Sequence, residues 1–195
     1  MIRNYLKSSW RNLKRDKSYS FINIFGLAIG IAACLMISLY IIDELSYDKF
    51  HEKSDRIHRL YIDGQFGNNK FTTPYTPNPA KDALLDEFSQ IESATHFLNI
   101  DQVRLEYENK VIIENSVFYA DSDFFEVFSF PMIEGDAEEA LSKPNQMVLT
   151  ESAARKYFGN EDPLGKMIEV NKDELFQVTG VCEDVPDNSH FHFDF

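Results

Sequence analysis

A run of 24 residues without a charged side chain, from Tyr19 to Ile42, constrains this chain more than any other feature. An α-helix of that length reaches roughly 36 Å, and the hydrocarbon core of a bilayer is about 30 Å thick. Every face of such a helix would be apolar or small, whereas a core helix of a soluble protein is shorter and carries a polar stripe. The run therefore predicts one membrane-spanning helix over residues 19–42.

Two other interpretations of this run stay open from the sequence. The first is a buried core helix. The second is a lipoprotein signal, because residues 31–34 (IAAC) loosely match a lipoprotein cleavage box, and Cys34 would then carry the lipid. Against the signal, the run starts only after 18 residues and stays hydrophobic for eight residues beyond Cys34. A mature chain beginning at a lipid-modified Cys34 would replace the spanning helix as the anchor.

Charged residues are distributed unevenly on the two sides of the run. Residues 1–18 carry a net charge of +5 and residues 43–195 a net charge of −18, which together give −13 for the chain. The positive-inside rule places the basic end in the cytoplasm and the larger part outside the inner membrane, in the periplasm where the cell has an outer membrane. The acidic balance argues against nucleic acid as a partner, because a polyanion would be repelled.

Residues 1–18 also have an amphipathic pattern of their own. Apolar residues recur at helical spacing beside the cations: Ile2, Tyr5, Leu6, Trp10 and Leu13. We expect a helix lying on the inner leaflet, held by apolar burial and by about 1 kcal/mol for each cation near anionic lipid. The residues expected to anchor it to membrane lipid are Arg3, Lys7, Trp10, Arg11, Lys14 and Arg15. A solvated basic flank is the alternative.

The remaining residues divide into a connecting segment and one domain. Residues 43–56 keep Leu45, Phe50 and several charges at spacings that would extend the membrane helix outward as a stalk. This stalk would be a stiff connection, since no Gly or Pro lies between Leu45 and Ile62. Residues 57–195 are enough for one domain with a core, and no disulfide is expected between Cys34 and Cys182.

Strands, tight turns and short helices alternate in this domain, which is typical of an α+β fold. The expected strands are residues 57–63, 71–75, 94–100, 103–107, 111–119, 146–149, 167–170 and 176–185. Helices are expected over 79–88 after Asn78 as the cap, over 122–128 after Asp121, and over 151–158 between Thr150 and Gly159. Turns are expected at residues 67–69, 109–110 and 171–173.

Several of these runs resemble one family. FYADSDFFEVFSFPMIEGD (118–136), QMVLTESAARKYFGNEDPLGKMI (146–168) and FQVTGVCEDVPDNSHFHFDF (176–195) resemble the periplasmic core domain of MacB-type and FtsX-type ABC transporter permeases. RNLKRDKSYSFINIFGLAIGIAA (11–33) and YDKFHEKSDRIHRLY (47–61) resemble the first helix and first extracytoplasmic segment of the same family. The block from Val148 to Ile168 is the most specific part of the match.

The resemblance implies an α+β, porter-like domain inserted between the first and second of four transmembrane helices. It also implies that the rest of that domain, three membrane helices and the segment that contacts the ATPase lie outside these 195 residues. The implied partners are an ABC ATPase subunit, which uses the ATP, a second permease copy and an envelope or periplasmic adaptor. No cofactor is expected in this chain itself.

No motif in the domain predicts catalysis, and we expect this chain not to be an enzyme. Residues 159–166 (GNEDPLGK) superficially resemble a phosphate loop, but five residues separate the glycines, Met167 replaces the magnesium-binding hydroxyl and two carboxylates would repel phosphate. We expect a helix C-cap and a turn there. His190, His192 and Asp194 would share one face of a strand and are weak candidates for a metal site. No nucleophile-elbow motif is present.

The leading functional hypothesis is a permease subunit, whose external domain is moved when a separate ATPase drives the membrane helices. The resemblance implies that the stalk after Ile42 is the lever that passes on this motion. The alternative is a single-pass envelope receptor or adaptor that reports ligand binding through helix association. Small residues suited to close helix packing are Gly26, Gly30, Ala28 and Ala32. These residues fit packing against other helices of a permease equally well. An enzyme anchored by one helix is a third interpretation.

Overall fold

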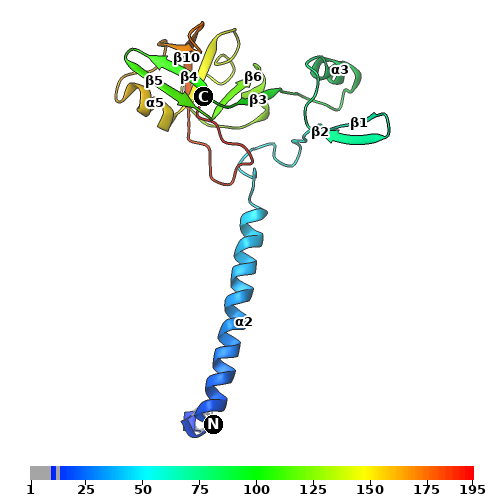
Figure 1. Cartoon of the computed structure of the whole chain (residues 1–195), viewed down its shortest axis with the longest axis vertical. Coiled ribbons are helices and arrows are strands. Elements are labelled where there is room, and N and C mark those ends of the chain that lie inside the picture. Colours follow the sequence, from blue (N-terminus) through cyan, green and yellow to red (C-terminus); the bar gives the residue numbers. More distant parts are fainter. Residues whose placement is uncertain (1–9, 12–13) are drawn as a thin grey trace. The chain divides into compact units, whose positions relative to one another are not determined.

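A computed structural model describes residues 10–11 and 14–195 (Figure 1). The chain divides into two compact units, Met1–Ser46 and Tyr47–Phe195. The first contains α2 (Lys17–Glu44), a helix of 28 residues in which no side chain is buried. Within the described part of the chain, α2 is the one helix with the length and composition to cross a membrane. The helix includes the whole predicted segment and extends it by two residues at each end.

The predicted helical stalk is wrong. α2 ends at Glu44, and residues 45–56 form successive turns, with Asp48 at a φ of 55° that a right-handed helix excludes. Tyr47 is the first residue of the second unit, and soon after it Phe50 and His51 turn into the core of that unit. The spacing that suggested a continuing helix therefore reflects side chains that pack inside the domain.

The second unit is built on a six-stranded mixed sheet in which β10 is the central strand. β9 and β7 pair with β10 in the antiparallel direction and β8 pairs with it in parallel, while β4 and β5 extend the sheet beyond β9. The strands are β4 (Val103–Tyr107), β5 (Lys110–Glu114), β7 (Met132–Glu134), β8 (Gln146–Thr150), β9 (Met167–Val170) and β10 (Glu174–Cys182). This α+β architecture confirms the predicted fold class.

Two small antiparallel sheets and three short helices complete the second unit. The hairpin β1–β2 (Ile62–Phe66 and Asn69–Thr73) forms one sheet, and β3 (Phe97–Ile100) pairs with β6 (Val117–Ala120) to form the other. The helices are α3 (Ala80–Glu87), α4 (Phe124–Val127) and α5 (Glu151–Phe158).

α5 follows β8 as its sequence signals predict. The hydroxyl of Thr150 accepts the N–H of Ala153 at the helix start, and Gly159 ends the helix at a φ of 65°. Thr150 is the last residue of β8 and also the N-cap of α5, so the same residue ends the strand and caps the helix. Asn171 and Lys172 have positive φ in the predicted turn between β9 and β10.

Other predicted elements need correction. β1 starts at Ile62 rather than at residue 57, and the expected strand over 111–119 is divided into β5 and β6. Asn78 does not cap α3, whose N-cap position is Pro79 without a side-chain bond. Asp123 rather than Asp121 occupies the N-cap of α4, although the carboxylate of Asp121 accepts the N–H of Asp123. The 109–110 turn lies one residue earlier, at 108–109.

The hydrophobic core has two parts. The first packs one side of α5 against the sheet and includes Leu105, Leu149, Tyr157 and Ile168. The second is an aromatic cluster around α4, with these buried phenylalanines at its centre: Phe124, Phe125, Phe128, Phe130 and Phe193. Hereafter "the aromatic cluster" means this second set.

Candidate functional site

Four small side-chain positions form a shallow groove along one face of α2. Gly26, Gly30, Cys34 and Ser38 are spaced four residues apart, and Leu27, Ile31 and Leu35 border them. Nothing lies within 4 Å of the place where a Cβ would stand on either glycine. The predicted pair Gly26 and Gly30 thus shares a face, whereas Ala28 and Ala32 do not line this groove. The four-residue spacing that relates Gly26 to Gly30 continues to Cys34 and Ser38, so this spacing predicts those two residues on the groove in place of Ala28 and Ala32.

The described residues of the basic end are solvent-exposed. Trp10, Arg11, Lys14 and Arg15 are helical, and the ammonium group of Lys14 lies 5.4 Å from the centroid of the Trp10 ring. Arg3 and Lys7, also predicted to anchor the chain to lipid, lie outside the described residues. Anchoring at the inner leaflet stays a prediction.

The three weak metal candidates do not converge. His190 pairs with Asp48, since its Nδ1 lies 2.7 Å from Oδ2 and its backbone N–H donates to Oδ1 at 3.0 Å. The side chain of His192 is exposed to solvent. Burial is the main cause that raises the pKa of the Asp194 carboxyl. Residues 190–195 form no ladder strand. In the part of the chain that the structure describes, no group of three or more His, Cys, Asp and Glu could hold a metal.

The segment 159–166 has a structural role. Gly159 and Gly165 adopt φ values of 65° and 77°, which supports the predicted helix end and turn. The Lys166 ammonium pairs with Glu161 and lies 5.2 Å from the centroid of the Phe158 ring. The lysine that a phosphate loop would direct at a nucleotide is therefore used to fix the turn.

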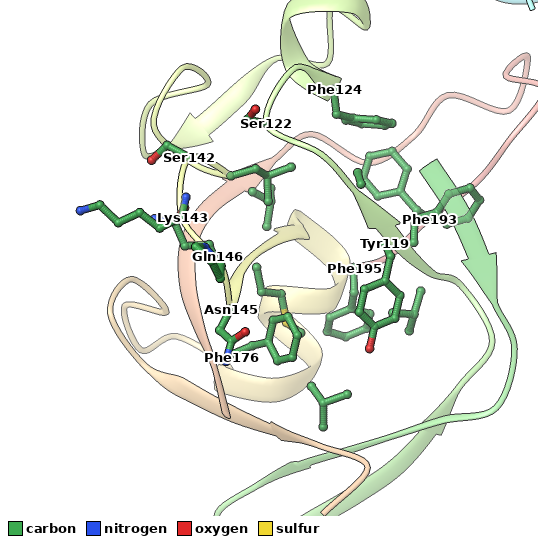
Figure 2. Close-up of a pocket in the computed structure, with 18 of the residues that line it drawn as sticks. Tyr119, Ser122, Phe124, Ser142, Lys143, Asn145, Gln146, Phe176, Phe193 and Phe195 are labelled. Atoms are coloured by element: carbon green, nitrogen blue, oxygen red, sulfur yellow. The ribbon is translucent and has the colours of Figure 1, made fainter. Parts of the chain in front are cut away.

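A pocket of about 440 Å³ opens between β6, residues 141–148 and the start of β10. Figure 2 shows Asn145, Gln146 and Phe176 on one side of the pocket and Tyr119, Phe193 and Phe195 on the other. Its walls are mainly apolar, with polar groups where Ser142, Lys143 and Glu174 line it. Burial, followed by the Glu174 carboxylate, raises the pKa of Tyr119, so this phenol stays neutral. Sequence reasoning missed this pocket.

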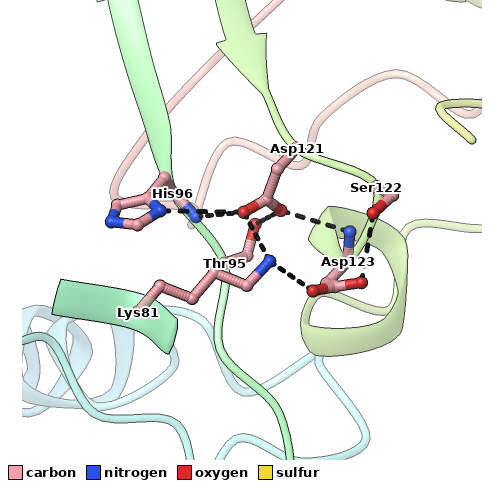
Figure 3. A network of polar contacts seen from close by, with 6 residues as sticks. All are labelled: Lys81, Thr95, His96, Asp121, Ser122 and Asp123. Atoms are coloured by element: carbon pink, nitrogen blue, oxygen red, sulfur yellow. Dashed lines mark hydrogen bonds and ion pairs between the residues drawn. The ribbon is translucent and has the colours of Figure 1, made fainter. Parts of the chain in front are cut away.

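A polar network joins α3 to the rest of the second unit (Figure 3). The ammonium of Lys81 lies 2.8 Å from Oδ2 of Asp121 and also pairs with Asp123. Asp121 further accepts the hydroxyl of Thr95 at 2.6 Å and the N–H of His96 at 3.0 Å. Burial acts to raise the pKa of the Asp121 carboxyl, but these donors together lower it below its usual value. The hydrogen bonds of the folded domain therefore stabilise the ionised form of the Asp121 carboxyl.

We expect Lys81→Met to release α3 rather than to unfold the whole unit. No residue of α3 is buried, so the Lys81 network supplies much of its attachment, and the variant leaves two carboxylates facing each other. Hydrogen exchange of the amides of residues 80–87 should become at least about tenfold faster. Lys49→Met is the matched control, because its pair with Asp55 is exposed and worth about 0–1 kcal/mol. Faster exchange in β8–β10 with unchanged α3 would contradict this role.

His51 is a buried polar residue that packs against the aromatic cluster, with an exposed fraction of 2%. Its Nδ1 accepts the N–H of Ser129 at 3.2 Å, and its Nε2 has no hydrogen-bond partner among the described residues. Burial lowers the pKa of His51, while Asp48 acts in the opposite direction. The ring packs against Phe50, Phe128 and Phe130.

His51 should therefore make the second unit less stable in acid. The unfolded chain binds a proton on this histidine as the pH falls through about 6.5, and the folded chain resists binding it until the pH reaches its lower pKa. In that window the free energy of unfolding should fall by at most about 1.4 kcal/mol per pH unit. His51→Gln, which cannot titrate, should lose this slope in denaturation curves from pH 5 to 8. Exposed His58→Gln should keep it, and an unchanged slope in His51→Gln would refute the assignment.

Comparison with known proteins places these features in one family. Residues 20–195 match the family model described as the MacB-like periplasmic core domain. No curated protein matches the chain at a significant level. The matched region begins inside α2 and includes the whole second unit.

Three solved structures are similar to the chain over part of its length. A domain from a Porphyromonas gingivalis protein described as a permease has 25% identity and a TM-score of 0.58, covering 69% of this chain and 58% of that one. The periplasmic region of MacB from Actinobacillus actinomycetemcomitans has 28% identity, a TM-score of 0.46 and coverages of 54% and 50%. The extracellular domain of the ABC-type transporter YknZ from Gram-positive bacteria has 19% identity and a TM-score of 0.38, covering 47% of this chain and 48% of that one. The chain thus spans 58% of the first and about half of the others.

Proposed function

This chain belongs to the MacB-like periplasmic core domain family of ABC-type permeases, and from that premise we propose that it is the membrane-anchored part of a permease that passes motion from membrane helices to a periplasmic domain. The domain itself is a permease domain and not a catalytic subunit. A separate ABC ATPase subunit supplies the energy, a second permease copy completes the transporter, and an envelope or periplasmic adaptor is the external partner. Membership of the family, over an apolar helix and the following domain together, carries the proposal.

Orientation in the inner membrane follows from charge. The basic residues before α2 stay in the cytoplasm, α2 crosses the bilayer and the acidic second unit lies in the periplasm. The groove of Gly26, Gly30, Cys34 and Ser38 serves as a packing face for another helix of the permease, since small residues allow close backbone approach.

Transmission uses the turns at residues 47–56 instead of a helical lever. Within the second unit these turns are fastened to α4 and the loop after it. The Lys53 ammonium donates to the C=O of Glu126 at 3.1 Å, and the N–H of Glu52 donates to Oγ of Ser129 at 3.2 Å. The Nδ1 atom of His51 accepts the backbone N–H of the same residue, Ser129. A displacement at the start of the unit is therefore passed directly to the aromatic cluster, because packed cores respond as units.

The test uses the full-length permease purified with its ATPase in nanodiscs. Hydrogen exchange of residues 47–57 and 124–130 should change on adding ATP, and a hydrolysis-deficient ATPase should hold one of the two exchange states. Exchange that is the same with and without ATP, in a complex that hydrolyses ATP, would contradict transmission. A chain that copurifies with no ATPase would instead favour a single-pass receptor.

A further inference from the structure

The contacts of the His51 ring fix its protonation state. Its Nδ1 accepts the backbone N–H of Ser129 at 3.2 Å, so this nitrogen carries no proton. The proton of the neutral ring is then on Nε2, which is buried and has no hydrogen-bond partner among the described residues. The contact with Ser129 therefore requires the neutral imidazole that has its proton on Nε2.

A second proton on His51 is incompatible with this contact. The proton would bind Nδ1, and two N–H donors, one from the ring and one from Ser129, would then face each other. The ring packs against Phe50, Phe128 and Phe130, whose side chains offer no acceptor. A charged ring at 2% exposure would also lose its hydration. Protonation should therefore displace the ring from this place.

Asp48 is the charged residue that acts on His51. Its carboxylate favours the charged ring, but burial is the larger cause and lowers the pKa of His51, so the ring is neutral near pH 7. The same carboxylate is already held by the backbone N–H and the Nδ1 of His190. Other ionisable side chains beside His51 in sequence, on α4 and on residues 186–193 are not among the causes of its pKa shift: Glu52, Lys53, Glu126, Asp187 and His192.

The turns at residues 47–56 can leave α4 while the six-stranded sheet stays folded. They contain no helix and no strand, so no ladder bond is lost when they move. Besides the His51 contact, two exposed hydrogen bonds hold them to α4 and the loop after it, from Lys53 to Glu126 and from Glu52 to Ser129. Exposed bonds of this kind add little stability, and such segments open at a lower free energy than the whole unit unfolds.

We propose that the contact between His51 and Ser129 is a proton-sensitive switch, in which a proton taken up from solvent breaks the contact and frees residues 47–56 from α4. The switch regulates the transmission route of the proposed function and rests on it. When the external solution is acidified, a displacement at the start of the second unit no longer reaches the aromatic cluster.

Native-state hydrogen exchange of the full chain in detergent micelles, from pH 5 to 8 and without ATPase, tests the switch. Each exchange rate is divided by the intrinsic rate of that amide at the same pH, which gives an opening constant. For the amides of Glu52 and Ser129 this constant should rise about tenfold for each pH unit below about 6.5, until the lower pKa of the folded chain is reached.

Urea separates local release from global unfolding. The amide of Val178 donates to the C=O of Lys166 inside the folded unit and should open only when the unit unfolds. At every pH the opening constants of Glu52 and Ser129 should exceed that of Val178 by at least about tenfold. In 1 M urea the constant of Val178 should rise and theirs should not, because a local opening exposes little surface.

His51→Asn is the test variant, because the Oδ1 of asparagine branches from Cγ as Nδ1 does and cannot titrate in this range. It should keep the protection of Ser129 at pH 7 and lose the pH dependence. His58→Asn is the matched control, since His58 is exposed and its loss should leave the pH dependence unchanged. If His51→Asn does not fold, nitrogen chemical shifts of the His51 ring in the unaltered chain give the same answer. The ring should be neutral with its proton on Nε2 at pH 7.5, and it should gain its second proton over the pH range in which Ser129 loses protection.

Two results would overturn the proposal. One is an opening of Glu52 and Ser129 that does not change with pH. The other is an opening of these amides that equals that of Val178 in size and in urea dependence, since residues 47–56 would then leave only when the whole unit unfolds. No ATPase is present, so a failure of the switch is distinguishable from a failure of the proposed function, which the ATP-dependent exchange of the complex tests.

Discussion

Two arginines in the middle of α2, introduced as Ile31→Arg with Leu35→Arg, should remove the chain from the membrane fraction. Each arginine at the centre of a spanning helix costs about 2.5–3.5 kcal/mol, so the pair costs roughly 5–7 kcal/mol. Both positions are exposed in the structure and no described residue of the helix is buried, so no contact within the described part of the chain offsets this cost. Alkaline extraction of membranes, followed by immunoblotting of pellet and supernatant, measures the change.

The control places the same charges near the ends of the helix, as Tyr19→Arg with Ile42→Arg. Long side chains there reach the interface, and the chain should stay in the pellet. If the central pair also left the chain in the pellet, a lipid on Cys34 would be the better explanation for membrane attachment. If unmodified chain were found in the supernatant without detergent, α2 would not be an anchor at all.

Phe124→Ala should be the most damaging single truncation in the second unit. Its side chain is 3% exposed, and burial of this kind predicts a loss of about 3–5 kcal/mol in the free energy of unfolding. Its ring meets others of the aromatic cluster and beyond: Phe97, Phe125, Phe128, Phe130, Phe191 and Phe193. Urea denaturation followed by tyrosine fluorescence and circular dichroism measures the effect.

Phe66→Ala serves as the comparison, because this side chain is 84% exposed and its truncation should change stability by no more than about 0.5 kcal/mol. The same loss in both variants would mean that the aromatic cluster does not hold the unit together. If Phe124→Ala unfolds the unit outright, Phe124→Leu, which keeps most of the apolar volume, should restore folding with a smaller loss.

The parts of the fold that the sequence predicts well depend on neighbouring residues. α5 follows from Thr150 and Gly159, which act within one helical turn of its ends. β4 and β9 have the predicted bounds, since apolar residues at their core-facing positions mark them directly. The uncharged run predicts α2 because its length alone meets the requirement of a bilayer.

The errors arise where distant residues decide. Phe50 and His51 have helical spacing, but Ser129, 78 positions from His51, supplies the N–H that draws the histidine into the core. The expected strand over 111–119 is broken beside Ser116, whose C=O accepts the N–H groups of Asp194 and Phe195. Neither contact is visible in the neighbouring sequence. Hydrophobic periodicity therefore predicts a helix or a continuous strand for these segments, and tertiary packing gives them a different structure.

The functional features divide in the same way. Gly26 and Gly30 were found because helical spacing is a local property, and the same spacing extends their groove to Cys34 and Ser38. The Lys81 network joins residues 40 and 42 positions apart, and the pocket beside β6 is lined by segments that are spread over residues 117–195. His190 and His192 were expected on one face of a strand, but the structure assigns no ladder strand there, and Asp48 contacts His190.

The central claim is that α2 places the second unit on the far side of the inner membrane from the basic end. Cysteine labelling in intact spheroplasts tests this claim most directly. Lys14→Cys and Asn109→Cys, both at exposed positions, report the two sides in a Cys34→Ser background. Cys182 can remain, because burial raises the pKa of its thiol to about 12. A membrane-impermeant maleimide should label Asn109→Cys at once and Lys14→Cys only after the membrane is opened. Labelling of Lys14→Cys in intact spheroplasts, with Asn109→Cys protected, would contradict the account.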